Sequence, residues 1–472
     1  MIKNMKAKHI LHRRGMDIRP QELIEKSIEI YNWLVTYKAE DESGIYYKVN
    51  PGGAADYSDK PVHGKYGLYS GSSGTGFFLL RLYETTGDEK YLDEAESIAE
   101  SLIANTAGSE FYLHKLETAE KSDLPITGWH TGVYSGPAGA GVFVMSLYRH
   151  VKDPKYLDFA RKLGDDICSV SNKDLDGRHL TNDLDLFSDG GFVLYFISLY
   201  KAVGDSKYLD IAREFARYIQ RKGIKHSSGG TYYEANDIGR VGMPKGSIYP
   251  GFSHGSAGIG FLFAVLYDAD RQKWELEEAE SIALFLESVA DVCGTGRLIP
   301  YIWSEYGDTE YSGRYYIGFC HGPAGTALLY RKLYEITGNT HYMDFCKELA
   351  QGIIETGAPE LNSWGLWNSY CSCCGVPGLI EFFAEMYEFT GMDLYLEYAK
   401  RSAARVIADS TEEKEKGKRC FYGFWDRTNP RDVQTYTGLY TGASGAGANI
   451  LKLFAVLNKT GVTDFWEYSY LE

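Results

Sequence analysis

The clearest chemistry in this sequence lies in a cysteine-rich phrase, Cys371–Cys374, which reads CSCC. Another cysteine, Cys320, precedes His321 in the phrase FCHG. Cysteine thiolates are strong ligands for Zn²⁺ and are also nucleophiles. The chain holds eight cysteines in 472 residues, and its basic first residues lack the apolar run of a signal peptide. We therefore expect a cytoplasmic protein with reduced thiols, in which crowded cysteines indicate a metal or reactive site rather than disulfides.

These phrases stand directly before a glycine motif, GxxG, that recurs along the chain. The residue before the motif is His254 in FSHG, His321 in FCHG and Cys374 in SCCG. Equivalent positions of a repeat come to equivalent places in a fold, so Cys320, Cys373 and Cys374 are predicted to be neighbours. Three thiolates with a fourth position open match a catalytic zinc site. The motif begins at Gly71, Gly136, Gly255, Gly322, Gly375 and Gly442, and the third copy reads SDGG from Ser188.

The remaining cysteines have different interpretations. Cys168, Cys293 and Cys346 lie in or near predicted amphipathic helices, where a buried structural thiol is the ordinary finding. Cys371 and His321 stand close enough to the predicted ligands to serve as reserve ligands.

The elements that must hold these residues are pairs of helices. A phrase such as LYKAVGDSKYLDIAREFARYI recurs, with an aromatic residue near the end of one helix and a short polar turn before the next. The first helix is apolar nearly all round, as in Ile259–Leu266, and the second is amphipathic, so the first is predicted to lie inside the second. The repeats predict an all-α fold, an α/α toroid of seven helical hairpins, with an open superhelix as the alternative. The aligned aromatics are Tyr83, Tyr148, Tyr200, Tyr267, Tyr334, Tyr387 and Phe454.

Composition narrows the domain organisation and the partners. No stretch is left over for a second fold, so we expect an N-terminal extension at 1–20 and a single toroid domain at 21–472. The net charge of −15 disfavours a nucleic-acid partner, because binding phosphates needs a basic face. No apolar stretch is long enough to span a membrane.

The seven hairpins with GxxG turns, and the order FSHG, FCHG, SCCG, resemble the lanthionine synthetase C-like family, the lantibiotic cyclases. The resemblance implies an α/α toroid with zinc at its mouth. It makes Cys320 the fifth-repeat ligand and Cys373 and Cys374 the sixth-repeat ligands. Cys374 stands where the family usually has histidine, which is similar to the subgroup whose zinc is held by three cysteines.

The resemblance also implies the catalytic residues. His254 matches the histidine that serves the family as acid or base. Both Asp183 and Asp185 fit the family's aspartate, and Arg314 matches its arginine loosely, offset by a couple of residues. His321 sits where cyclases carry tyrosine or histidine.

The expected reaction follows from these groups. Zinc lowers the pKa of a substrate thiol, and the thiolate adds to the β-carbon of a dehydroalanine or dehydrobutyrine. His254 then protonates the α-carbon of the resulting enolate, whose oxygen Arg314 or the helix N-termini stabilise. The expected partners are a dehydrated precursor peptide, made by a separate dehydratase, or a glutathione-like thiol.

Two other functions compete with the cyclase. A carbohydrate-active α/α toroid would use the loop tryptophans but gives the three cysteines no role. A zinc-stabilised scaffold would bind peptides without catalysis. Long segments before the motifs, rich in Tyr, Trp and Gly, are predicted to form the substrate-binding rim, with aromatic side chains that merely seal the end of the barrel as the alternative; these segments are Gly44–Tyr69, Gly229–Phe252, Leu298–Phe319 and Phe421–Tyr440.

Overall fold

The computed structural model describes residues 17–42, 44–49, 65–106, 132–181, 183–234, 248–309, 311–361, 369–413, 418–420, 422–425 and 433–463. Helices dominate this part of the chain, and the only strands in it belong to short two-stranded sheets. Of the predicted rim, the central parts (50–64, 235–247 and 426–432) lie outside the described residues.

A helix begins within each glycine motif, as the repeat predicts. The first residue of each helix follows the first motif glycine, or Ser188 in the third copy, which has the extended or irregular backbone of a residue before a helix. These are the inner helices α3 (Ser72–Thr86), α6 (Pro137–Val151), α8 (Asp189–Val203), α10 (Ser256–Asp270), α12 (Pro323–Thr337), α14 (Val376–Thr390) and α16 (Ala443–Asn458).

The inner helices are buried on every side over their first three turns. In α10 every residue from Ser256 to Leu266 is buried. The second glycine of the motif makes this packing possible, because a Cβ on Gly325 would lie 1.9 Å from the carbonyl oxygen of Phe319. The chain therefore folds back tightly over the start of the helix that it is about to enter, which only a residue without a side chain permits.

The recurring tyrosine marks the end of every inner helix except α16, which has Phe454 at the aligned position. The backbone N–H of the residue that follows the helix donates to the tyrosine's carbonyl, as Gly204 does to Tyr200 over 2.7 Å. That residue has the left-handed conformation, with φ of 76° at Gly204. A glycine at this position ends a helix without steric cost, which explains the repeated LY…TG phrase. Lys152, Arg271 and Lys459 take the same conformation in the copies that lack the glycine.

The outer helices are amphipathic. In α9 the residues Tyr208, Leu209, Ala212, Phe215 and Ile219 are buried, at the spacing of one helical face. The outer helices that follow an inner helix are α4 (Glu89–Asn105), α7 (Pro154–Val170), α9 (Ser206–Gln220), α11 (Lys273–Val289), α13 (Thr340–Glu355) and α15 (Asp393–Ala408).

Short antiparallel hairpins after the outer helices were not part of the sequence-based expectation. Each pairs two strands of two to four residues, such as Asn172 opposite His179 in β3 and β4. The strands are β1 (Lys38–Asp41), β2 (Gly44–Tyr47), β3 (Asn172–Asp174), β4 (Gly177–His179), β5 (Ile224–Lys225), β6 (Thr231–Tyr232), β7 (Asp291–Cys293), β8 (Gly296–Leu298), β9 (Thr411–Glu413), β10 (Lys418–Cys420), β11 (Tyr422–Trp425) and β12 (Val433–Thr435).

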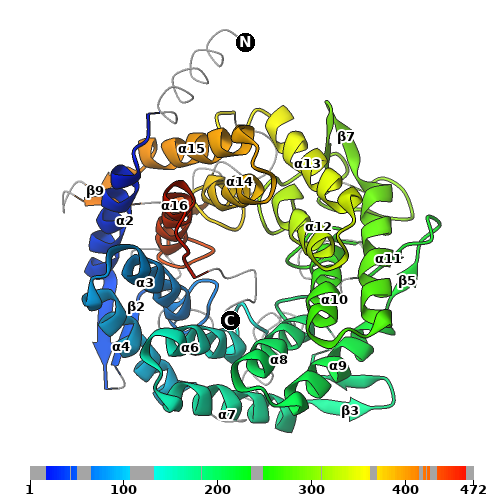
Figure 1. Ribbon diagram of the computed structural model, residues 1–472, viewed down its shortest axis with the longest axis horizontal. Helices are drawn as coiled ribbons and strands as arrows, with labels where there is room; N and C mark the ends of the chain where they lie inside the picture. The colour runs from blue at the N-terminus through cyan, green and yellow to red at the C-terminus, as the bar shows by residue number, and fades with distance from the viewer. Residues whose placement is uncertain are drawn as a thin grey trace. The chain divides into compact units, whose positions relative to one another are not determined.

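The contacts divide the chain into two compact units. The first comprises Met1–Leu102 and Ile353–Thr463. In it α16 packs between α14 and α3, α15 packs on α14, and α2 (Pro20–Leu34) packs on α16 (Figure 1). The outer partner of the last inner helix is thus supplied by the N-terminal part of the chain. The sequence repeat did not reveal this, because α2 carries no copy of the recurring phrase.

The second unit contains Ile103–Gly352. Its inner helices α6, α8, α10 and α12 pack in that order, and α7, α9 and α11 each pack on the inner helix that precedes them (Figure 1). The single toroid domain at 21–472 stays a prediction. Among the described helices, none is both long enough and apolar enough to cross a membrane.

A buried carboxyl group stabilises the turn between α10 and α11. Glu275 is fully buried, and its Oε2 accepts a hydrogen bond from the backbone N–H of Gln272 over 3.3 Å. The pKa of Glu275 is raised to about 8, mainly because the carboxyl group is buried. The hydrogen bond with Asp270 and the negative charge of Asp270 raise it further. Asp270 keeps its charge because Arg213 binds it through two nitrogen atoms, at 2.7 and 2.8 Å. The folded chain therefore holds a proton on Glu275 that the unfolded chain releases near pH 4.5.

We predict that Glu275→Gln makes the protein more stable at alkaline pH. A raised pKa contributes stability that is complete below about pH 4.5 and is lost as the pH rises through 8. The neutral amide keeps the hydrogen bonds without ionising, so the melting temperature of the variant should exceed that of the wild type by roughly 2–4 °C at pH 8.5. The difference should vanish near pH 5.

Thermal unfolding followed by circular dichroism at a series of pH values measures this difference. Glu277→Gln is the matched control, because Glu277 lies on the same helix with 56% of its side chain exposed. If the Glu275 and Glu277 variants show the same pH dependence, the buried proton does not exist.

Candidate metal centre and acid–base pair

The turn that enters α14 holds the CSCC phrase in place. Gly375 N–H donates to the carbonyl of Cys371 over 2.9 Å, and Cys373 N–H donates to the carbonyl of Tyr440 over 3.0 Å. These bonds fix two consecutive cysteines whose sulfur atoms lie 3.5 Å apart. Cys373 and Cys374 are 3% and 6% exposed, so the pair is removed from bulk solvent.

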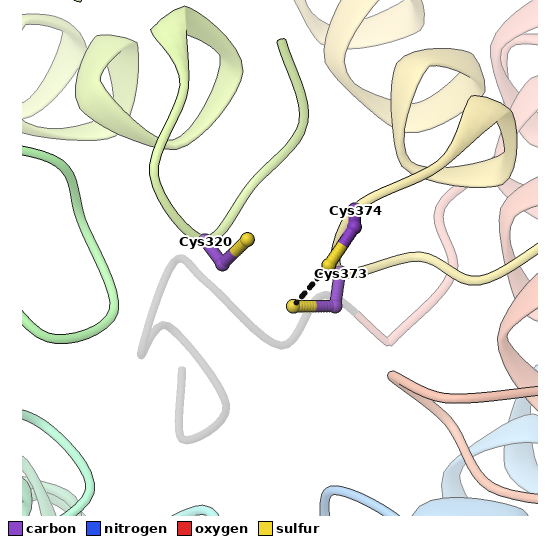
Figure 2. A group of neighbouring side chains, drawn as sticks. All are labelled: Cys320, Cys373 and Cys374. Carbon is purple, nitrogen blue, oxygen red and sulfur yellow. Dashed lines mark hydrogen bonds between the residues drawn. The ribbon is translucent and has the colours of Figure 1, made fainter. Parts of the chain in front are cut away.

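Cys320 occupies the matching turn before α12. Its carbonyl accepts hydrogen bonds from the backbone N–H and the hydroxyl of Ser253, at 2.8 and 3.1 Å. The sulfur atoms of Cys320, Cys373 and Cys374 all lie within 4.8 Å of one another and turn toward one another (Figure 2). This buried group could bind a metal ion.

The donor set fits zinc. A tetrahedral zinc ion with Zn–S bonds of about 2.3 Å holds its sulfurs about 3.8 Å apart, within the spacing found here. Soft thiolates select zinc over Mg²⁺ and Ca²⁺, which take oxygen ligands. Three protein ligands leave one tetrahedral position for a substrate atom.

Cys371 lies beside this group without belonging to it. Its sulfur contacts the hydroxyl of Ser369 at 3.1 Å and accepts from the backbone N–H of Cys374 at 3.4 Å. Burial opposes a charge on this thiol, but hydrogen bonds from the Cys374 side chain, from Ser369 and from the backbone lower the pKa of Cys371 overall. Its role as a reserve ligand stays a prediction.

Cys346, which lies outside this group, differs from Cys371 because its thiol has a raised pKa. Cys346 is fully buried on α13, and its thiol donates to the carbonyl of Ala327 over 3.5 Å. Burial raises the pKa of Cys346 to about 12, as expected for a structural thiol.

His254 and Asp185 form a hydrogen-bonded pair. Nδ1 of His254 lies 2.9 Å from Oδ2 of Asp185, and Oδ1 of Asp185 accepts from the backbone N–H of Phe187 at 2.9 Å. Because a carboxylate only accepts, the Nδ1 atom carries the proton in this bond. The Nε2 atom of His254 is therefore the one that can give or take a proton in a reaction. Of the two candidate aspartates, the structure brings Asp185 to the histidine.

Asp183 lies on the same segment in a different role. Its backbone carbonyl accepts from the N–H of Asp189 over 3.2 Å, and its own N–H donates to the hydroxyl of Thr181 over 3.3 Å. These bonds shape the irregular turn that precedes α8 and that presents Asp185 to His254.

Aromatic rings surround the second histidine of the site. His321 is 9% exposed, and its ring lies 5.1 Å from that of Tyr249, 4.9 Å from that of Tyr301 and 5.6 Å from that of Tyr316, measured between centroids. The ring of His254 lies 5.7 Å away. The imidazole rings of His254 and His321 therefore lie side by side, and aromatic packing fixes the position of the His321 ring. The three tyrosines lie in the predicted rim segments, but their packing on His321 was not predicted, since these irregular segments have no periodic pattern to single them out.

Arg314 lies at the outer edge of this cluster. It is exposed, and its guanidinium sits 5.1 Å from the ring of Tyr311. Tyr311 in turn packs edge-on against Tyr301, at 5.9 Å. The structure thus connects Arg314 to His321 through two aromatic rings, and a direct role for it at the reacting atoms stays a prediction.

A family model for the lanthionine synthetase C-like protein matches residues 63–463. The chain belongs to the lanthionine synthetase C-like family. A search among curated protein sequences finds no match.

Solved structures agree on the fold of this lanthionine synthetase C-like chain. Nisin cyclase is similar with a TM-score of 0.61 and 17% identity, over 88% of this chain and 94% of that one. Cellobiose 2-epimerase from Bacillus thermoamylovorans B4167 is similar with a TM-score of 0.51 and 13% identity, over 92% of this chain and 99% of that one. The fold class is therefore the α/α toroid that the repeats predict. At these identities the likeness shows the fold alone. It therefore does not distinguish a cyclase from a carbohydrate-active enzyme.

The turn before α10 packs against the backbone of His321 at Gly251, where only a glycine fits. A Cβ at this position would lie 2.5 Å from the Cα of His321 and 2.7 Å from its carbonyl oxygen. Because backbone atoms cannot yield cheaply, Gly251→Ala should lower the unfolding free energy by about 1–3 kcal/mol or more. Gly461→Ala is the matched control, since a Cβ there meets nothing within 4 Å. Chemical denaturation of both variants checks the prediction, and equal stabilities would contradict the packing described.

Proposed function

We propose that this protein is a zinc-dependent, thioether-forming enzyme that adds a thiol to a dehydroalanine or dehydrobutyrine residue in a peptide. The observation that carries the proposal is the buried group of Cys320, Cys373 and Cys374. Family membership and the structural likeness to nisin cyclase support it. The carbohydrate-active alternative leaves these cysteines without a role.

The three thiolates would hold one zinc ion and leave one position open for a substrate thiol. When bound, zinc would lower the pKa of that thiol. The sulfur lone pair of the substrate thiolate then forms a bond to the β-carbon of the dehydroamino acid. The π electrons of the carbon–carbon double bond move toward the carbonyl, so negative charge develops on the enolate oxygen.

His254 would complete the addition by proton transfer. Its Nε2 takes up the proton that the substrate thiol releases and then gives it to the α-carbon, which converts the enolate into the saturated thioether product. Asp185 orients the imidazole through Nδ1 and stabilises its protonated form. His321, which packs against the three tyrosines and lies beside His254, would contact the substrate. Arg314 would stabilise the negative charge on the enolate oxygen. To do so, the Arg314 side chain must move away from the ring of Tyr311.

The substrate is proposed by chemistry alone. An acceptor with a dehydroamino acid must come from a reaction that removes water from serine or threonine. A dehydrated precursor peptide from a separate dehydratase supplies both the acceptor and an internal cysteine. A glutathione-like thiol would supply the nucleophile for an acceptor that lacks one.

We predict about one zinc ion per chain. Elemental analysis of the protein purified without added metal measures it, because three thiolates retain zinc through purification. Cys320→Ala and Cys373→Ala should each lose most of the zinc. Cys168→Ala is the control and should keep it, since Cys168 lies on α7 outside the group. Full zinc content in Cys373→Ala would reject the ligand assignment.

We predict that His254→Asn keeps the zinc and the fold but slows thiol addition by roughly 10²–10⁴-fold. Asp185→Asn should slow it by less, because the imidazole remains. The assay follows thioether formation between a dehydroalanine-containing peptide and its own cysteine or glutathione. His341→Asn is the control, because His341 is 56% exposed and pairs with Glu287.

Two results would contradict the proposed reaction. Zinc-loaded wild-type protein that does not accelerate addition over the uncatalysed rate would reject the activity. An unchanged rate in His254→Asn, together with a lower melting temperature, would make the histidine structural.

A further inference from the structure

A buried polar contact joins α16 to the cysteine turn. Asn449 Nδ2 donates to the hydroxyl oxygen of Ser372 over 3.2 Å and to the carbonyl oxygen of Pro377 over 2.8 Å. A backbone carbonyl only accepts hydrogen bonds, so the amide nitrogen must face it and the orientation of the side chain is settled. Asn449 and Ser372 are 3% and 7% exposed.

Ser372 stands between Cys371 and Cys373, and it is clamped on two sides. A Cβ on Gly378, in the first turn of α14, would lie 2.2 Å from its carbonyl oxygen. A Cβ on Gly445, in the first turn of α16, would lie 2.3 Å from its hydroxyl oxygen. The position of Ser372 therefore sets the backbone path through the two cysteines that follow it.

The other repeats provide an internal comparison. Where the packing is described, the residue that lies against the next repeat's second glycine is apolar, as with Leu186 against Gly258, Phe252 against Gly325 and Leu439 against Gly74. Ser372 against Gly445 is the polar exception among them. The position of Asn449, seven residues after the start of the motif, is apolar or aromatic elsewhere: Phe78, Phe143, Tyr195, Leu262, Leu329 and Phe382.

The two polar residues thus occur together, in contact, where the CSCC turn before α14 packs against α16 of the following repeat. A buried polar pair adds less stability than the apolar packing that the fold uses at the other copies, because both groups lose their hydration. The fold does not need the pair, since the same helix crossing forms without it in the neighbouring repeats. The cysteine turn is what distinguishes this copy.

We propose that Asn449 is a positioning residue for the metal centre, acting through Ser372 and Pro377. Its two hydrogen bonds tie the residue before Cys373 and the first turn of α14 to one rigid helix. The two thiolates are then held at the spacing that zinc needs before the metal arrives. This inference rests on the proposed zinc site and adds a residue to its support.

Zinc affinity of the full chain tests the proposal. Asn449→Leu places at this position the residue that α10 and α12 carry, so it fits the fold while removing both donors. Loss of a group that orients ligands weakens metal binding roughly 10–100-fold, and we expect this range in competition with a chromophoric chelator. Ser372→Ala removes one of the two bonds and should weaken zinc binding by less.

The control removes a buried hydrogen bond of another inner helix. Ser198→Ala deletes the bond from the Ser198 hydroxyl to the carbonyl of Leu194, 2.9 Å long and buried in α8. It should lower the melting temperature without changing zinc affinity. A purely structural Asn449 would behave in the same way.

Replacement of zinc by Co²⁺ gives a readout that is independent of activity. The thiolate-to-cobalt absorption of Asn449→Leu should shift or broaden relative to that of the wild type, while that of Ser198→Ala should not. Wild-type zinc affinity and cobalt absorption in folded Asn449→Leu would overturn the proposal. If that variant does not fold, Ser372→Ala decides by the same two measurements. A wild-type chain that binds no zinc would overturn the metal site and this inference together, whereas zinc binding that is unchanged in the variants overturns this inference alone.

Discussion

The structure depends on one close approach: a backbone carbonyl of the entering turn lies where the motif's second glycine would carry a Cβ, as found at Gly74, Gly191, Gly258, Gly325, Gly378 and Gly445. At Gly258 that distance is 2.0 Å to the carbonyl oxygen of Phe252, and at Gly445 it is 1.7 Å to that of Leu439. Because no other residue fits, the glycines fix the path of the turn relative to the helix. The residues one and two places before the motif consequently reach the same place in every repeat. These residues can then differ between copies without altering the frame: His254 stands before the motif in the fourth copy, Cys320 and His321 in the fifth, and Cys373 and Cys374 in the sixth.

This constraint explains what the sequence could predict. The glycine motif and the recurring tyrosine mark helix starts and ends, so the inner helices, the outer helices and the neighbourhood of Cys320 with Cys373 and Cys374 follow from the repeat. These predictions succeed because short-range rules for helix ends and close packing decide them.

The remaining features depend on contacts that a repeat does not encode. The choice of Asp185 over Asp183 comes from the irregular turn before α8, where Thr181 and Asp189 shape the backbone. The tyrosines around His321 reach it from segments without periodicity. The short hairpins after the outer helices have two to four residues per strand, which is too short for an alternating pattern. Polar exceptions such as Asn449 become informative only when the structure shows which residue faces them.

The pairing of α2 with α16 has a consequence for how the chain folds. Ser27 on α2 donates to the carbonyl of Gly447 on α16 across 420 residues of sequence. The helix α2 is therefore synthesised long before α16, the helix against which it packs. The apolar side of α2, which includes the buried residues Leu23 and Ile30, lacks its main partner until α16 has been synthesised. Closing such a long loop makes this contact a late event with a high entropic cost, and it leaves an aggregation-prone surface exposed for most of translation.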